Sequence, residues 1–126
     1  MSDILTSETV TVWTTNAGAA IEHPVSDAMA SAGIKTIRVS LEMRNSTGVI
    51  QTQVYYQYSA DGDTWETAVL VGPLVTESGE PTFDSTFTDI SADALPYLRF
   101  GVKASNASES GLNLAYVTYR IELRAS

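Results

Sequence analysis

The segment from Val54 to Trp65 constrains the fold of this chain more than any other. It reads VYYQYSADGDTW, an aromatic and β-branched run that enters an Asp-Gly turn and leaves through Thr and Trp. This order is typical of a β-hairpin, because Gly62 can adopt the positive φ of a tight turn and Asp61 tolerates it better than most residues. No segment of the chain shows a helical periodicity as strong as this hairpin pattern. We therefore expect a β protein.

Short segments of alternating apolar and polar residues continue on both sides of this hairpin, separated by Gly, Pro and polar residues. Strands are expected over residues 8–15, 34–44, 49–59, 64–71, 82–88, 97–104 and 113–124. Their number and spacing predict an all-β fold, an antiparallel β-sandwich of jelly-roll type with about eight strands and little helix. The Ala-rich stretch 16–33 is compatible with a long loop or with a short strand around Ile21, so the strand order there stays open.

The chain is long enough for one domain with a core of its own. It has 126 residues and no cysteine, so neither a disulfide framework nor a thiolate metal site is available to it. We expect a flexible N-terminal arm over 1–7 and a single β-sandwich domain over 8–126. The expected core residues share the inward face of their strands: Ile37, Val39, Leu41, Val54, Tyr56, Trp65, Phe100, Val102, Val117, Tyr119 and Ile121.

The charge of the chain argues against two classes of partner. Fifteen acidic residues against seven basic ones give a formal net charge of −8. A molecule this acidic is not attracted as a whole to nucleic acid or to anionic lipid. The first residues carry neither a basic segment nor an apolar run, and no apolar stretch approaches the length of a membrane span. We therefore expect a protein made in the cytoplasm, with no nucleic acid and no membrane among its partners.

The sequence contains no arrangement of residues typical of catalysis. His23 is the single histidine, and it precedes Pro24 in a segment read as a loop, where an ordinary solvated or capping role is expected. Asp61, Asp63 and Glu66 would supply oxygen ligands for calcium at the hairpin tip, but turn chemistry explains the two aspartates without a metal. We expect no enzyme activity and no cofactor.

Two sets of side chains are candidates for binding surfaces. The first is basic and falls on strand positions opposite the apolar core positions: Arg38, Arg99, Lys103, Arg120 and Arg124. Because 97–104 and 113–124 are joined by one loop, we expect them to pair, which would gather arginines on one outer sheet face for an acidic partner. The second set is aromatic, with Tyr55 and Tyr116 expected at the surface and Trp65 favoured as core.

The hairpin motif Gln57-Tyr58-Ser59-Ala60-Asp61-Gly62-Asp63-Thr64-Trp65 is followed by Leu98-Arg99-Phe100-Gly101-Val102 and by the closing Tyr119-Arg120-Ile121-Glu122-Leu123. This succession resembles discoidin-like jelly-roll modules and the small β-sandwich accessory proteins of tailed-phage particles, over roughly residues 34–123. The phage resemblance implies a non-enzymatic virion structural protein, a capsid decoration or head/tail accessory protein. Such a protein would act as a homo-oligomer on the virion surface, with a capsid or tail protein and itself as partners.

The interface implied by that function would use the N-terminal arm and the basic set. Ile4 and Leu5 lie on a polar arm suited to adding an edge strand to a neighbour or to filling its groove. The alternative function is a carbohydrate-binding β-sandwich module. It would use exposed Tyr55, Trp65 or Tyr116 as a stacking platform, with calcium at Asp61 and Asp63.

Overall fold

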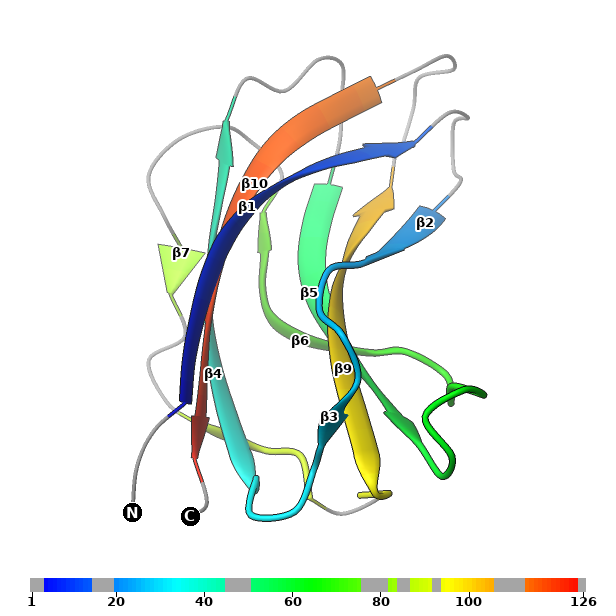
Figure 1. The fold of residues 1–126 in the computed structure, drawn as a ribbon. Helices are drawn as coiled ribbons and strands as arrows, with labels where there is room; N and C mark the ends of the chain where they lie inside the picture. Colours follow the sequence, from blue (N-terminus) through cyan, green and yellow to red (C-terminus); the bar gives the residue numbers. More distant parts are fainter. Residues whose placement is uncertain are drawn as a thin grey trace.

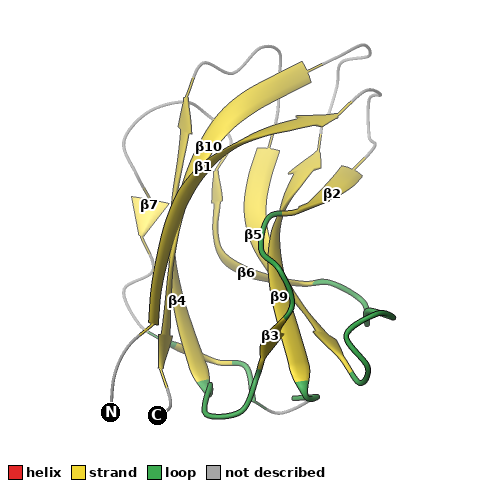
Figure 2. Ribbon diagram, in the orientation of Figure 1, coloured by secondary structure: helices red, strands yellow, loops and turns green. Residues whose placement is uncertain are grey.

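The computed structural model describes residues 4–14, 20–44, 51–75, 82–83, 87–91, 94–105 and 113–124. Two antiparallel β-sheets of five strands each pack face to face, and their inner faces enclose the core (Figure 1). The described residues form strands, turns and loops and contain no helix, so no described helix is long and apolar enough to cross a membrane (Figure 2). The expected all-β sandwich is confirmed.

The first sheet, called sheet A here, has the strand order β1-β10-β4-β7. Its strands are β1 (Ile4–Thr14), β10 (Asn113–Arg124), β4 (Thr36–Arg44) and β7 (Thr82–Phe83), and β8 (Thr88–Asp89) also pairs with β4. Sheet B has the order β2-β9-β5-β6. Its strands are β2 (Ala20–Pro24), β9 (Tyr97–Ser105), β5 (Gln51–Ser59) and β6 (Val69–Val75), and β3 (Met29–Ala30) also pairs with β9.

The pairing is nested along the chain. The first strand pairs with the last, β2 pairs with β9, β4 with β7, and β5 with β6 at the centre of the nest. A long antiparallel hairpin rolled up in this way places alternate pairs in opposite sheets, which is compatible with the expected jelly roll. Eight strands make the two sheet paths, close to the number expected, and β3 and β8 are two-residue additions.

The first strand begins earlier than the sequence predicted. Residues 4–7, assigned in advance to a flexible arm, belong to β1 and pair with β10 in a register from Ile4↔Leu123 to Ser7↔Arg120. The boundary expected between residues 7 and 8 is therefore wrong. The alternation of residues 4–8 is weak, but β10 runs on to Arg124 and its backbone groups provide partners for the whole segment.

The core contains most of the residues expected there. Ile37, Leu41, Val102 and Val117 are fully buried, and Tyr56 packs against the core cluster from its edge. Trp65 is the exception, since it lies outside the core cluster and is half-buried. Tyr58 adds a polar bond inside the sandwich, because its hydroxyl donates to the carbonyl oxygen of Ile90 at 2.7 Å.

Candidate functional site

The outer face of sheet B carries a row of polar side chains beside a groove. Side chains of β5 alternate between the two faces. Thr52, Val54, Tyr56 and Tyr58 point toward the core, and the other five residues lie on the outer face: Gln51, Gln53, Tyr55, Gln57 and Ser59. In an antiparallel sheet, directly paired residues share a face. The partners of this row on β9 are therefore also on the outer face: Ser105, Lys103, Gly101, Arg99 and Tyr97.

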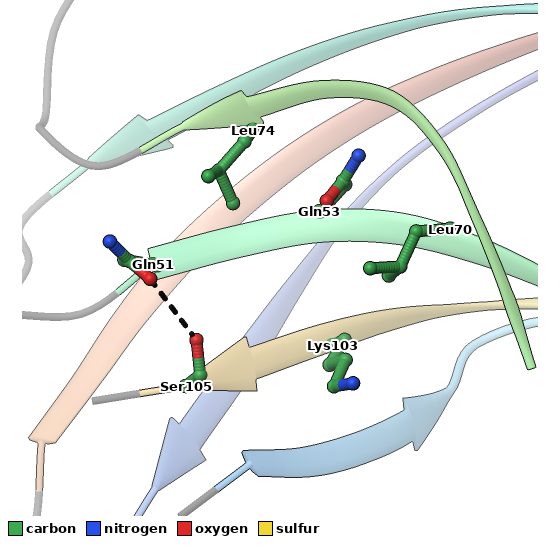
Figure 3. Close-up of a pocket in the computed structure, with 6 residues that line it drawn as sticks. All are labelled: Gln51, Gln53, Leu70, Leu74, Lys103 and Ser105. Carbon is green, nitrogen blue, oxygen red and sulfur yellow. Dashed lines mark hydrogen bonds between the residues drawn. The ribbon is translucent and has the colours of Figure 1, made fainter. Parts of the chain in front are cut away.

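A groove of about 290 Å³ lies on this face, between β9, β5 and β6 (Figure 3). Its lining combines amides, a hydroxyl, an ammonium and two leucines: Gln51, Gln53, Lys103, Ser105, Leu70 and Leu74. The leucines are exposed, 45% for Leu70 and 54% for Leu74. Polar groups on β5 and β9 thus face an apolar wall on β6, an arrangement that suits a partner with both kinds of surface.

The bowed path of β6 makes room for the groove. The register with β5 shifts between the pairs Val54↔Val71 and Thr52↔Val75, and Gly72 at the shift has a φ of 80°. Only glycine adopts that φ without strain. Gln53 reaches across the bulge, where its Nε2 donates to the carbonyl oxygen of Gly72 at 2.9 Å. The Gly72-Pro73 bulge thereby separates Leu70 from Leu74 along the wall (Figure 3).

Lys103 is the cation of the groove. It is half-buried, and within the described residues its ammonium makes no ion pair. Glu22 of β2 lies directly opposite Lys103 on the far side of β9, and Gln53 lies opposite on the near side. Lys103 thus lines the groove, and the exposed Glu22 lies beside it on the same face but outside the groove lining.

Tyr55 is buried, contrary to the surface position expected for a sugar platform. Its place in the alternation of β5 is on the outer face of the sheet. Its partner in the register is Gly101, and the Tyr55 ring occupies the space where a side chain at position 101 would stand. Its exposed fraction is 0%, and its hydroxyl has no hydrogen-bond partner among the described residues. Burial raises the pKa of this phenol to about 12. The carbohydrate-binding alternative cannot use this residue.

Trp65 is likewise not where it was expected. It lies beside the outer face of sheet B, with the Arg99 guanidinium carbon 4.4 Å from its ring centroid. Arg99 Nε donates to Gln57 Oε1 at 2.8 Å, and Gln57 Nε2 donates to the carbonyl oxygen of Glu66 at 3.0 Å. This chain of contacts binds the segment after the hairpin turn to the sheet surface. Trp65 is excluded from the core because the chain returns as a loop over 60–68 and β6 begins only at Val69.

The expected single arginine face is wrong. β9 lies in sheet B and β10 in sheet A, so Arg99 and Lys103 are on one side of the sandwich and Arg120 and Arg124 on the other. The two strands therefore do not form the antiparallel pair that their proximity along the chain predicted. Arg38 on β4 lies with the β10 residues, since it pairs with Glu122 in the register.

Of the three arginines expected on this face, Arg38 and Arg124 have interaction partners within the chain. Arg38 makes a bidentate ion pair with Glu122, with N···O distances of 2.8 and 3.0 Å. Its guanidinium and that of Arg124 both lie over the ring of Phe87, at 4.7 and 3.9 Å. Arg120 is exposed, and Tyr116 on the same strand is 44% exposed. Tyr116 is thus at the surface as expected, but on the sheet opposite to Trp65.

The hairpin tip is organised by its own side chains. Asp61 Oδ1 accepts hydrogen bonds from the backbone N–H groups of Asp63 and Thr64, each at 2.9 Å, and Ser59 Oγ accepts from Gly62 N–H at 2.9 Å. These bonds lower the pKa of Asp61. The described residues contain no group of three or more acidic, His or Cys side chains able to hold a metal ion. The turn interpretation of Asp61 therefore has a direct structural basis.

His23 is not in the loop where a solvated or capping role was expected, and its side chain is not solvated. It lies in β2, where it pairs with Val102 of the core face, and it is buried at 9% exposure. The sequence suggested a loop because Pro24 follows, but Pro24 is the last residue of β2 and opposes Gly101. Ile4 and Leu5, the other expected interface residues, have their backbones in β1.

Comparisons with known proteins identify the fold alone. No protein-family model matches the chain, and no curated protein does. A solved structure of infectious bursal disease virus, Gx strain, matches 97% of this chain with a TM-score of 0.64 at 7% identity. This chain spans 32% of the length of that viral chain. A second structure, of Bacillus endospore appendages described as disulfide-linked pili, matches 100% of this chain and 93% of the other at 11% identity, with a TM-score of 0.35.

Proposed function

We propose that this chain is a non-enzymatic structural protein of a virus particle, located on the particle surface. The fold supports the proposal, because nearly the whole chain superposes on part of a chain from a virus structure. A small sandwich can add buried area across the seams of a shell, and many copies make modest individual contacts sufficient through avidity. Its partners are a capsid or tail protein and further copies of itself, so we expect a homo-oligomer.

The observation that carries the proposal is the apolar character of β6. Leu70 and Leu74, which line the groove on the outer face of sheet B, are exposed at 45% and 54%. They lie on an edge strand of that sheet. Val69 of the same strand is exposed at 46%, but it pairs with Tyr56 and so lies on the other face. Clustered exposed apolar side chains are typical of surfaces that association covers. Pro73 interrupts the hydrogen-bonding edge of the same strand, so this surface would be joined through side chains rather than by adding a strand.

The carbohydrate-binding alternative is less well supported. It requires an aromatic platform open in the monomer, but Tyr55 is buried and Trp65 is covered on one side by Arg99. Tyr116 is exposed on the outer face of the other sheet. The three aromatic residues therefore do not form one surface, and a lone tyrosine offers a single stacking contact.

The proposed function is tested on particles purified from the source of the sequence. Quantitative mass spectrometry should find the chain at a fixed copy number relative to the main shell protein, and antibody labelling should place it on the particle exterior. Neighbouring genes for capsid and portal proteins would support the same conclusion. Absence of the chain from purified particles, or a neighbouring glycoside hydrolase gene, would contradict it.

A further inference from the structure

Sheet B carries a groove that contains a lysine at one end and a turn with exposed carboxylates at the other. The groove with Lys103 lies at the end where β5 begins and β9 finishes. The turn after β5 lies at the other end, and its acidic side chains are all exposed: Asp61, Asp63 and Glu66. Figure 1 shows the loop 60–68 projecting at the lower right, with the first residues of β5 at the opposite end of the sheet.

The two features cannot meet within one molecule. From Gln51 to Ser59, β5 advances eight residues, which is about 26 Å at roughly 3.3 Å per residue. The turn is also held rigidly, since Asp61 and Ser59 accept hydrogen bonds from the backbone N–H groups of Asp63, Thr64 and Gly62. The acidic tip is therefore a preformed projection that points away from the groove of its own chain.

We propose that the groove on sheet B receives the acidic 61–66 tip of a second copy of this chain, in a head-to-tail contact. In this contact the carboxylates of Asp63 and Glu66 approach Lys103, and the amides of Gln51 and Gln53 supply the hydrogen-bonding capacity that Ser105 and Gly72 leave unused. Leu70 and Leu74 form the apolar side of the groove beside the entering turn. The inference rests on the proposed function, because it specifies how copies of a structural protein would join.

The charge and the shape of the 61–66 turn are the reasons for inferring that it occupies the groove. Lys103 makes no ion pair among the described residues, and Glu22, which lies opposite it in the register, does not line the groove. The 61–66 turn carries three exposed carboxylates. Asp61 is engaged by its own turn, which leaves Asp63 and Glu66 to face outward. A contact between two different patches of one molecule is heterologous, so it propagates into a ring or a filament instead of stopping at a dimer. That outcome suits a protein repeated on a particle.

The test uses the full-length chain in sedimentation velocity over a range of protein concentrations and at two salt concentrations. Lys103→Glu should weaken self-association at least about tenfold, and so should Asp63→Asn combined with Glu66→Gln, since each removes one side of a complementary pair. The wild-type association should weaken as salt rises, because exposed charges are screened beyond about 8 Å at physiological ionic strength. Asp27→Asn removes an exposed carboxylate elsewhere and should associate like wild type.

Mixing the two variants distinguishes a head-to-tail contact from a symmetric one. The Lys103→Glu chain keeps a working tip and the Asp63→Asn, Glu66→Gln chain keeps a working groove, so an equimolar mixture should form 1:1 heterodimers and nothing larger. Circular dichroism confirms folding, and Lys103→Gln replaces Lys103→Glu if the latter unfolds.

Three results would overturn the inference: a mixture that associates no better than either variant alone, variants that associate like wild type, or a wild-type chain that stays monomeric. Loss of association in Arg120→Glu but not in Lys103→Glu would place the contact on sheet A and overturn it as well. The proposed function is judged separately, by the copy number of the chain in purified particles.

Discussion

Gly101 and Tyr55 face each other across β9 and β5, and the absence of a side chain on one provides the space for the ring of the other. A Cβ built at position 101 would overlap Cζ and Oη of Tyr55. Cross-strand packing of an aromatic ring over glycine in this way stabilises a register that glycine alone would weaken. Gly101 thus lets the ring of Tyr55 lie flat against the sheet although the residue occupies an outward position.

Gly101→Ala should lower the free energy of unfolding by about 1–3 kcal/mol, the usual range for overpacking a well-filled site. Urea denaturation monitored by fluorescence measures the change. In a Tyr55→Ala background the same substitution should cost much less, because the overlapping ring is gone. Equal losses in both backgrounds would contradict the packing explanation.

The hydroxyl of Tyr55 is a buried polar group that should destabilise the folded protein. It is buried without a partner among the described residues, so Tyr55→Phe should raise the free energy of unfolding by about 1 kcal/mol. The pKa of the phenol is raised to about 12 in the folded protein, above its ordinary value of 10.0. The phenol therefore has no pH-dependent effect on stability below pH 10, and stability falls as the pH rises from 10 toward 12, because the unfolded chain ionises first.

Measuring stability against pH for both proteins tests this linkage. The decline of stability between pH 10 and 12 should be smaller in Tyr55→Phe than in wild type, while Lys and Arg contribute equally to both. Identical declines would show that Tyr55 ionises equally easily in the folded and unfolded states.

At the scale of elements, β1 is an edge strand of sheet A that pairs with β10 along its whole length. Its first four residues were expected to form an arm that leaves the fold, yet their backbones take part in the sheet from Ile4 onward. The hydrogen-bond partners along β10 extend to Arg124, and an unpaired end of a sheet strand would leave those groups to water.

Deletion of residues 1–7 should therefore lower the melting temperature, because it removes four residue pairs from the β1–β10 ladder. An independent arm would be removed without any thermal effect. Differential scanning calorimetry distinguishes the two outcomes. Deletion of the last two residues, 125–126, provides a control that leaves every pair of that ladder in place.

At the scale of the whole molecule, the two outer sheet faces have different characters. On sheet A, Arg38 is neutralised by Glu122 and stacked with Arg124 on Phe87. On sheet B, the groove leaves two leucines and a lysine open. Since apolar side chains in a surface groove gain most from being covered, sheet B is the face that we expect to associate.

Leu74→Asp should reduce self-association and binding to the particle, while the melting temperature of the monomer stays nearly unchanged, since Leu74 is 54% exposed and lies outside the core. Light scattering after size exclusion and thermal unfolding give the two readouts. Tyr116→Ser removes a comparably exposed residue from the opposite face and should leave association intact. The reverse pattern would assign the interface to sheet A.

Much of the fold can be predicted from the alternation of apolar and polar residues within each strand. Val39 and Leu41 on β4, and Val117 and Ile121 on β10, are buried as their period of two requires, because successive side chains of a strand point to opposite faces. The Asp-Gly turn can also be predicted from the sequence, because its hydrogen bonds join residues that are close along the chain. Asp61 and Ser59 organise it through bonds to residues at most five positions away.

What the sequence did not determine was which strand lies beside which. The pairing of 97–104 with 113–124 was expected from their proximity along the chain, but the roll places β9 against β5 and β10 against β1 and β4. That choice separates Arg99 from Arg120, buries Tyr55 through Gly101, and brings Lys103 next to Leu70 and Leu74. Period-two patterns specify a face for each residue, and only the packing of two sheets specifies the neighbours on that face.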